Sequence, residues 1–258
     1  MKQKNINKKL EKVCSRYSNE IKSIAHVGAH LGQEIDIYKK FDIKNIYLFE
    51  PQKSIFLKLQ ENTKNLPNVK LFNTALGSIE KKEFLNKASE NDGASSSILE
   101  PALHKDLHEE IKFHEKEEID LKRFDSFGIE DVNFLTIDVQ GFELEVIKGF
   151  GEKIKKLDFI FTEINKDYVY KNNVLIQDLD SELNKHGFLR IKTYWDGYLP
   201  YGDAFYVRKR LLTKKYIAFS KISKKFFDSN INLLFLKIIN YRKLIFKTKK
   251  YLNRFFRF

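Results

Sequence analysis

The chain has 258 residues, which is long enough for one α/β domain with an appendage and a sizeable hydrophobic core. Its single cysteine, Cys14, excludes an internal disulfide framework and a cysteine metal cluster, in agreement with a reducing compartment. The net charge of +12 is unevenly distributed, because residues 208–258 contain 16 Lys and Arg and one acid. The remaining residues, 1–207, contain 31 basic and 34 acidic side chains, so a nearly balanced domain precedes a strongly basic tail.

The first segment, residues 1–21, is polar and rich in lysine and predicts a helix before the first strand. Its positive charge is not followed by an apolar run, so the pattern does not predict a secretory signal. No stretch of the sequence approaches the roughly 20 apolar residues that a membrane-spanning helix needs. We therefore expect a cytoplasmic protein.

Residues 22–51 predict a strand, a glycine turn, a helix opened by Gly32, and a second strand over 46–49. Gly28 and Gly32 bracket the turn, GAHLG, and Glu50 stands at the end of the second strand. An acid about 20 residues beyond such a turn is placed to accept hydrogen bonds from ribose hydroxyls. Because GAHLG is shorter than the glycine pattern of dinucleotide enzymes, it suits a nucleoside without a pyrophosphate, such as S-adenosylmethionine. The alternative is a glycine turn with a purely structural role.

The next segment predicts a helix over 54–64, a strand over 69–72 and a short edge strand over 82–86. The loop 88–100 is rich in small hydroxyl residues around Gly93 and is long for a connection. Long ordered loops are often functional, so we weigh a binding role for this loop against a mobile surface turn.

The polar segment 101–115 contains His104, His108 and His114. The spacing of the first two places them on one face of a helix. Because no third ligand stands nearby in the sequence, we expect surface histidines rather than a metal site.

Two further buried strands are predicted over 134–137 and 157–164, with a helix over 143–148 between them. Asp138 follows the first of these strands and Glu163 lies near the end of the second. In open α/β sheets, ligands bind beyond the carboxyl ends of the strands. We therefore expect both acids to lie at a ligand site together with the acid of the earlier strand, although each alone could be a solvated loop acid.

The motifs HVGAHLGQE, LFEP, TALG, GASSS, IDVQGFELEVIKG and FTEI, in this order, resemble the FkbM family of S-adenosylmethionine-dependent methyltransferases over roughly 23–208. The resemblance implies the class I methyltransferase (Rossmann-like) fold, an α/β architecture whose seven-stranded, mostly parallel sheet has one antiparallel strand. It also implies methyl transfer to a hydroxyl, commonly of a sugar or a polyketide-type product. The expected parts are an N-terminal helical extension (1–21), a methyltransferase domain (22–210) and a basic amphipathic helical tail (211–258).

Site roles follow from the resemblance, position by position. Cofactor binding is implied for His26, Gly28, Ala29, His30, Gly32, Glu50, Pro51, Ala75 and Asp138. Glu50 matches the ribose-binding acid, and Asp138 lies where methyl donor and acceptor meet. Two departures stand out. His26 replaces an acid found in many members, which alters contacts to the methionine ammonium group, and Gln140 replaces the usual glutamate, which argues against a base or metal-ligand role there.

Methyl transfer from a sulfonium requires alignment of the acceptor oxygen and removal of its proton. The catalytic candidates are Asp138, Glu163 and His104, with His30 as another candidate base. Burial in a cleft would raise the pKa of a carboxylate, which suits a base. We expect no metal, because the sequence contains no dedicated cage of His and carboxylate ligands.

The acceptor-binding candidates are Ser95, Ser96, Glu143, Trp195 and Tyr198. Aromatic side chains with polar tips on a loop suit stacking against sugar faces and hydrogen bonding to sugar hydroxyls. The alternative for the aromatic pair is a packed hairpin with Trp195 in the core.

The tail mixes basic and large apolar residues over 211–258, as in an amphipathic helix that lies in an anionic membrane surface. The alternatives are helices that cap the sheet or that pair with a second copy in a homo-oligomer. Nucleic-acid binding is not favoured, because the sequence contains no recognition module.

Docking on the inner face of a membrane suits a lipid-linked glycan acceptor. We therefore expect an O-methyltransferase that acts on a sugar or glycan hydroxyl in cell-surface polysaccharide biosynthesis. The alternatives are an RNA-modifying methyltransferase guided by the tail and a catalytically inactive methyltransferase fold that binds partners.

Overall fold

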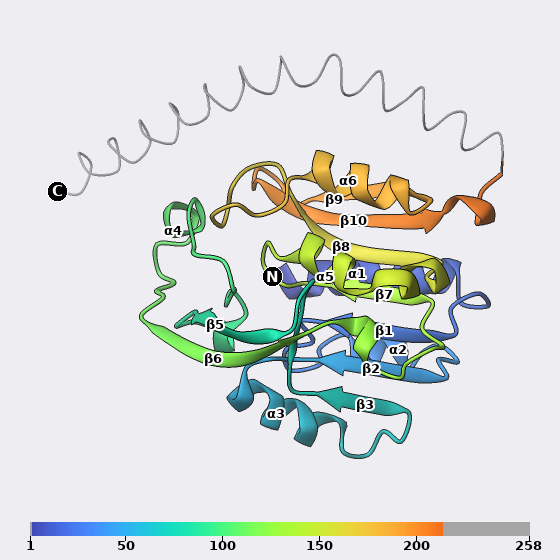
Figure 1. Ribbon diagram of the computed structural model, residues 1–258, viewed down its shortest axis with the longest axis horizontal. Helices are drawn as coiled ribbons and strands as arrows, with labels where there is room; N and C mark the ends of the chain where they lie inside the picture. The colour runs from blue at the N-terminus through green and yellow to red at the C-terminus, as the bar shows by residue number, and fades with distance from the viewer. Residues whose placement is uncertain (1, 214–258) are drawn as a thin grey trace, which may run out of the picture. The chain divides into compact units, whose positions relative to one another are not determined.

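The computed structural model describes residues 2–213. Their centre is a seven-stranded sheet with the order β3-β2-β1-β7-β8-β10-β9 (Figure 1). Neighbouring strands from β3 to β8 run parallel, whereas β10 (Tyr201–Arg208) pairs antiparallel with β8 (Phe159–Asn165) and with β9 (Phe188–Trp195). This topology confirms the predicted α/β fold for this part of the chain. The sheet has seven strands, is mostly parallel and contains one antiparallel strand.

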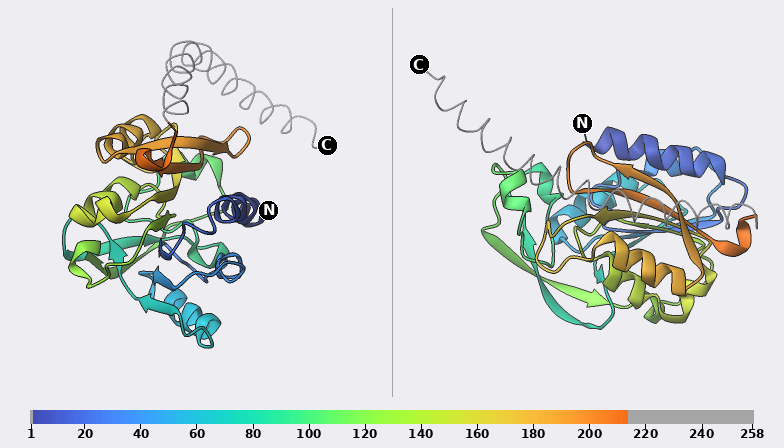
Figure 2. Two further views of the ribbon diagram at one scale, coloured as in Figure 1. Left: turned by 90° about the vertical axis from the view of Figure 1, so that its right-hand side faces the viewer. Right: turned by 90° about the horizontal axis from the view of Figure 1, so that it is seen from above.

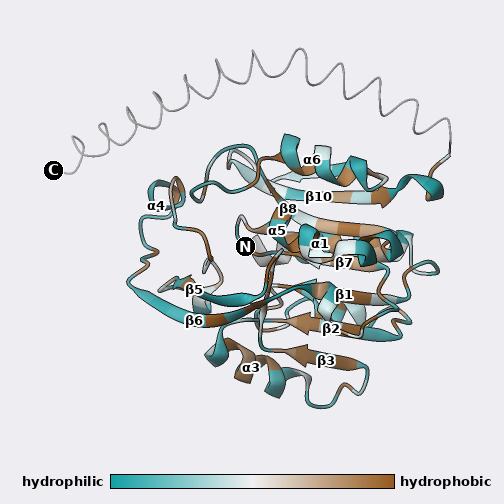
Figure 3. Ribbon diagram, viewed as in Figure 1, coloured by the Kyte–Doolittle hydropathy of each residue, from teal (hydrophilic) through white to brown (hydrophobic). Residues whose placement is uncertain are grey.

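The central parallel strands are buried more deeply than the strands at the β3 edge of the sheet. β1 (Ser23–Val27), β7 (Phe134–Ile137) and β8 are buried at every position, as expected for parallel strands covered on both faces. Burial decreases toward the edge, through β2 (Asn45–Phe49) to β3 (Val69–Phe72). Figure 3 shows the hydrophobic colouring of β2, β3 and β7.

Helices cover both faces of this sheet. α1 (Lys2–Arg16), α2 (Ile35–Tyr38) and α3 (Lys53–Thr63) lie on one face. α5 (Glu143–Gly149) and α6 (Ile176–Lys185) lie on the other, as the left view of Figure 2 shows. α1 is the helix expected at the N-terminus, and it belongs to the same compact unit as the sheet.

A smaller sheet has the order β4-β6-β5, with β4 (Ala75–Leu76), β5 (Lys81–Lys87) and β6 (Glu115–Lys122). In Figure 1 this sheet and α4 (His104–Leu107) lie at the end toward which the arrows of β2 and β3 point. The strand expected over 82–86 is therefore present, but it belongs to a second sheet above the carboxyl ends of the first.

The helix expected to open at Gly32 begins only at Ile35 and has four residues. Before it, the backbone makes consecutive turns, with the Gly32 N–H bonded to the Ala29 carbonyl at 2.8 Å and the Ile35 N–H to the Gly32 carbonyl at 3.1 Å. The Gly32 N–H is bonded within the turn, and the prediction that Gly32 opens the helix is wrong.

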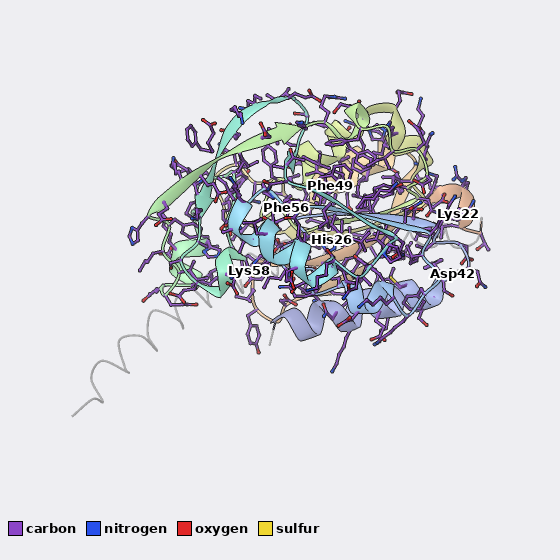
Figure 4. All side chains as sticks on the ribbon, turned by 90° about the horizontal axis from the view of Figure 1, so that it is seen from below. Lys22, His26, Asp42, Phe49, Phe56 and Lys58 are labelled. Carbon is purple, nitrogen blue, oxygen red and sulfur yellow. The ribbon has the colours of Figure 1, made fainter. Side chains whose placement is uncertain are left out.

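The two ends of the parallel strands are well separated. Lys22 and Asp42 precede β1 and β2, and Figure 4 shows them at one end of the molecule, away from His26 and Phe49. Short 3-10 segments complete the described elements: η1 (Asn91–Gly93), η2 (Phe124–Ser126), η3 (Gly151–Lys156) and η4 (Lys209–Leu211).

Within residues 2–213, every helix is too short or too polar to cross a lipid bilayer. The amphipathic tail expected over 211–258 lies, from residue 214 onward, outside the described residues.

Candidate functional site

The glycine turn after β1 brings three strand ends together. The N–H groups of Gly28 and Ala29 both donate to the Phe49 carbonyl at 3.0 Å, and the Asp138 N–H donates to the Val27 carbonyl at 3.0 Å. Gly28 has a φ of +80°, and a Cβ atom there would lie 1.9 Å from the Asp138 carbonyl oxygen. Only glycine fits at this point, where the ends of β1 and β7 touch.

Glu50 stands at the end of β2 and is fixed by backbone N–H groups. Its Oε2 accepts from the His30 N–H at 2.9 Å, and its Oε1 accepts from the Gln52 N–H at 2.8 Å. Glu50 is 3% exposed, and burial raises the pKa of its carboxyl to about 7. A carboxylate can accept about four hydrogen bonds, so this side chain retains acceptor capacity for a ligand hydroxyl.

A first cavity of about 580 Å³ opens over the carboxyl ends of the strands. Its lining includes Gly28, Glu50, Pro51, Ala75, Ser96 and Asp138. Phe49, Leu76 and Ile98 give it an apolar side. An apolar side next to the Glu50 carboxylate suits a flat apolar ring joined to a group with hydroxyls.

A second cavity of about 550 Å³ lies beside the first. Its lining includes Ile6, Leu10, His26, Glu34, Asp138 and Asp203. Gly28, His30, Ala94 and Asp138 line both cavities. The two cavities therefore meet beside the glycine turn, at the carboxyl end of β7.

Gln140 joins the acids at the ends of β7 and β8. Its Nε2 donates to Asp138 Oδ1 at 2.6 Å and to Glu163 Oε2 at 3.0 Å. The Tyr170 hydroxyl lies 3.2 Å from Gln140 Oε1, and the Ser97 hydroxyl donates to the Gln140 carbonyl at 2.8 Å. The sequence marked Gln140 as a departure from the family. Its bridging contacts could not be predicted, because they depend on β7 and β8 being neighbours in the sheet.

His26 is buried beneath the second cavity. It is 3% exposed, and burial lowers the pKa of its imidazole to about 4, so the ring is neutral near pH 7. Its Nδ1 lies 3.2 Å from the Tyr38 hydroxyl and 4.0 Å from Glu34 Oε2. A neutral imidazole does not supply the negative charge that an acid would supply at this position.

Glu143 is enclosed at the start of α5. It is 0% exposed, and its Oε1 accepts from the Gly141 N–H at 2.9 Å. Burial raises the pKa of this carboxyl to about 7, and the charge of Asp138 adds to the effect. Within the described part of the chain, Oε2 has no hydrogen-bond partner, and Glu143 is not among the residues that line either cavity.

The three histidines of the segment 101–115 differ in burial. His104 is 3% exposed and packs 5.3 Å from the ring of Tyr170, so the expectation that it lies at the surface is wrong. His108 is partly buried, with Nε2 3.0 Å from the Tyr201 hydroxyl, whereas His114 is exposed. Of the described residues that line the two cavities, Asp138 lines both and His104 lines neither. The structure therefore does not place these two catalytic candidates in one cavity.

The acceptor candidates are dispersed. Ser96 lines the first cavity, and the Ser95 carbonyl accepts from the Tyr170 hydroxyl at 2.8 Å. Trp195 packs partly against the core, with the Lys166 ammonium 3.6 Å from its ring centre, and Tyr198 is 85% exposed. The aromatic pair lies outside the lining of both cavities as far as the chain is described.

Within residues 2–213, no cluster of three or more His, Cys, Asp or Glu side chains is arranged to hold a metal ion. The expectation of a metal-independent site stays a prediction.

Comparison with known proteins adds the family. A family model, the methyltransferase FkbM domain, matches residues 26–190, which is more than half of the chain. The chain belongs to the FkbM methyltransferase family. This match confirms the predicted family, and with it S-adenosylmethionine as the cofactor of the methyltransferase domain.

Two relatives extend the comparison. The 2-O-methyltransferase NoeI of Sinorhizobium fredii is 26% identical over 138 residues, which cover 50% of this chain and 57% of NoeI. The crystal structure of an FkbM methyltransferase from Methylobacillus flagellatus superposes with a TM-score of 0.50 at 12% identity, over 72% of this chain and 43% of that one. The second likeness concerns the fold alone, and this chain spans little more than half the length of NoeI.

The residues of the two cavities fit S-adenosylmethionine. The cofactor has a ribose that donates hydrogen bonds, an adenine ring with apolar faces, a cationic sulfonium and an amino-acid end with an α-ammonium and an α-carboxylate. Glu50 offers carboxylate oxygens to a ribose, and the apolar side of the first cavity suits an adenine. The second cavity offers the carboxylates of Glu34, Asp138 and Asp203 to a cation. The absent Cβ of Gly28 allows the glycine turn to pack directly against the Asp138 backbone, where both cavities have shared lining residues.

Proposed function

We propose that the protein transfers the methyl group of S-adenosylmethionine to a hydroxyl of a sugar or glycan. The observation that carries the proposal is the junction of the two cavities at Asp138, directly beside the glycine turn. Bound S-adenosylmethionine supplies an electrophilic methyl group on its sulfonium. The protein then has to hold an acceptor hydroxyl near that methyl group and receive the proton of the hydroxyl.

Glu50, Pro51 and Ala75 form the wall of the first cavity that would hold the adenosine part. Two backbone N–H groups orient the Glu50 carboxylate before any ligand binds, so little side-chain entropy is lost on binding.

Asp138 is the proposed base. Gln140 donates to its Oδ1, which fixes the plane of the carboxylate and leaves Oδ2 as the oxygen that receives the acceptor proton. The same amide donates to Glu163 Oε2 at 3.0 Å, so it bridges the two acids. A positioned base of this kind contributes on the order of 10²- to 10⁴-fold to a rate.

An oxygen acceptor is supported by the name of the 2-O-methyltransferase relative, and the choice of a sugar hydroxyl follows the resemblance to the FkbM family. Our further proposal of a lipid-linked glycan in cell-surface polysaccharide biosynthesis is supported by the basic, aromatic-rich composition of residues 211–258. Removal of residues 214–258 should then abolish sedimentation with anionic liposomes. Equal sedimentation of the shortened and full chains would reject membrane docking.

The catalytic test uses Asp138→Asn, with Asp36→Asn as the control because the Asp36 side chain is 89% exposed. Asp138→Asn should lower methyl transfer at least about 100-fold while calorimetry still detects cofactor binding. The control should retain both properties. Unchanged turnover in Asp138→Asn would remove Asp138 from the mechanism.

The acceptor test follows the label from radioactive S-adenosylmethionine into carbohydrate and RNA fractions of the cell extract. Label in carbohydrate supports the proposal, and label confined to RNA contradicts it. An absence of binding heat with the cofactor contradicts methyltransferase activity altogether.

A further inference from the structure

The second cavity is acidic. Glu34, Asp138 and Asp203 line it, and no Lys or Arg is among its lining residues in the described chain. His26 adds no positive charge at neutral pH, because burial keeps its imidazole neutral. A cavity of this kind favours a ligand group with positive charge. The cofactor of the proposed reaction carries such a group in the α-ammonium of its methionine part.

Lys9 fixes one of these acids from the N-terminal helix. Its Nζ donates to Asp203 Oδ2 at 2.7 Å and to Asp196 Oδ1 at 2.7 Å, and Lys9 itself is 7% exposed. One ammonium between two carboxylates leaves the trio with a net charge of −1. Because Lys9 occupies Oδ2, the Oδ1 atom of Asp203 is the oxygen available to a ligand.

The same helix forms part of the wall. Ile6 and Leu10 line the second cavity one helical turn apart, and Lys9 lies between them in the sequence. Ile6, Leu10 and Asp203 all fall outside the segment 26–190 that matches the family. This wall is therefore a feature of the present chain that its family membership does not assign.

Of the other two acids of the cavity, Asp138 has a competing contact and Glu34 lies beside the neutral imidazole of His26. Asp138 Oδ1 accepts from the Gln140 amide at 2.6 Å, and its carboxylate has the proposed role of base. Glu34 Oε2 lies 4.0 Å from His26 Nδ1. Asp203 pairs with Glu163 in the β8–β10 register, and it lines the second cavity together with Asp138.

We propose that Asp203 binds the α-ammonium group of S-adenosylmethionine, and that Lys9 is the positioning residue that holds the Asp203 carboxylate in the second cavity. The inference rests on the proposed function, since it requires this cofactor. α1 becomes part of the cofactor site rather than an extension beside it.

The test compares two nucleosides that differ in the amino-acid part. S-adenosylhomocysteine contains the α-ammonium, and 5′-methylthioadenosine lacks it together with its carboxylate. Asp203→Asn in the full-length protein should weaken S-adenosylhomocysteine binding about tenfold to a hundredfold in calorimetry, the loss expected for a hydrogen bond to a charged group. The affinity for methylthioadenosine should stay within about threefold of wild type, because that ligand does not reach Asp203.

Asp196→Asn is the matched control. It removes a Lys9 partner at the same 2.7 Å distance, but Asp196 is not among the described residues that line the cavity. Its affinity for both nucleosides should stay near wild type. Lys9→Met should reproduce the selective loss of S-adenosylhomocysteine affinity seen for Asp203→Asn. Lys9→Arg, which keeps the positive charge, should keep the wild-type affinity. A merely structural role for Lys9 would weaken both nucleosides alike.

The outcomes separate the inference from the proposed function. If the wild-type protein binds both nucleosides and Asp203→Asn weakens both equally, or neither, the inference is wrong and the proposed function stands. If the wild-type protein binds neither nucleoside, the proposed function fails as well.

Discussion

Replacement of Gly28 by alanine tests the closest backbone contact in the site. The new methyl group would lie 1.9 Å from the Asp138 carbonyl oxygen and 2.9 Å from the carbonyl carbon, both of them backbone atoms. The Asp138 N–H is bonded to Val27 at 3.0 Å, so the end of β7 cannot move without breaking the sheet. An alanine at a φ of +80° adds about 1–2 kcal/mol of strain, and overpacking adds about 1–3 kcal/mol.

We therefore expect Gly28→Ala to lower the free energy of unfolding by about 2–5 kcal/mol. Urea denaturation followed by circular dichroism measures this change, and nucleoside binding by calorimetry should be lost in parallel. For a domain of this size the melting temperature should fall by about 2–4 °C per kcal/mol.

Gly128→Ala is the control, because a Cβ atom at Gly128 would meet no described atom within 4 Å. That variant should stay within about 0.5 kcal/mol of wild type. If Gly28→Ala is as stable as Gly128→Ala and still binds nucleosides, the described contact between β1 and β7 is wrong.

Three further variants test buried polar groups. Gln140→Leu removes the amide donor shared by Asp138 and Glu163, so the turnover number should fall about tenfold or more while cofactor affinity changes little; equal loss of both would contradict a positioning role. Glu143 has a folded-state pKa of about 7, above its ordinary 4.5, so the folded protein holds this proton more tightly and loses stability as pH rises from 4.5 to 7. The stability of Glu143→Gln relative to wild type should therefore increase as the pH rises from 4.5 to 8 in denaturant titrations, and parallel pH curves would refute this account. Lys9→Met leaves two acids without their shared cation and should lower the free energy of unfolding by about 3–5 kcal/mol, a loss that low pH should reduce.

The sequence was most informative where its signals were local. The glycine turn and its acid lie close together in the sequence, since the two buried strands with Gly28 and Glu50 fall within thirty residues. The predicted fold class and family are confirmed. The start of the next helix was harder to predict from the sequence. It begins at Ile35, after a turn in which the Gly32 N–H bonds to the Ala29 carbonyl. Helix starts depend on such backbone contacts more than on residue spacing.

The remaining features depend on contacts between distant segments. Lys9 meets its partners across 187 and 194 residues, and no periodicity near residue 9 marks it as part of a cavity. His104 lies in a polar segment that predicts exposure, yet it packs beneath Tyr170. The bridge from Gln140 to Glu163 likewise exists only because β7 and β8 are neighbours in the sheet.

The position of β10 has a consequence for the nascent chain. β9 is translated first, yet β10 lies between it and β8 in the sheet, so β9 has no neighbouring strand among the described residues until 201–208 have left the ribosome. Lys9 can bind Asp203 only after residue 203 has been translated, because Asp203 lies on β10, the last strand of the described residues. A chain that ends before residue 201 therefore has a complete glycine turn but lacks β10. Its second cavity lacks Asp203 as a lining residue.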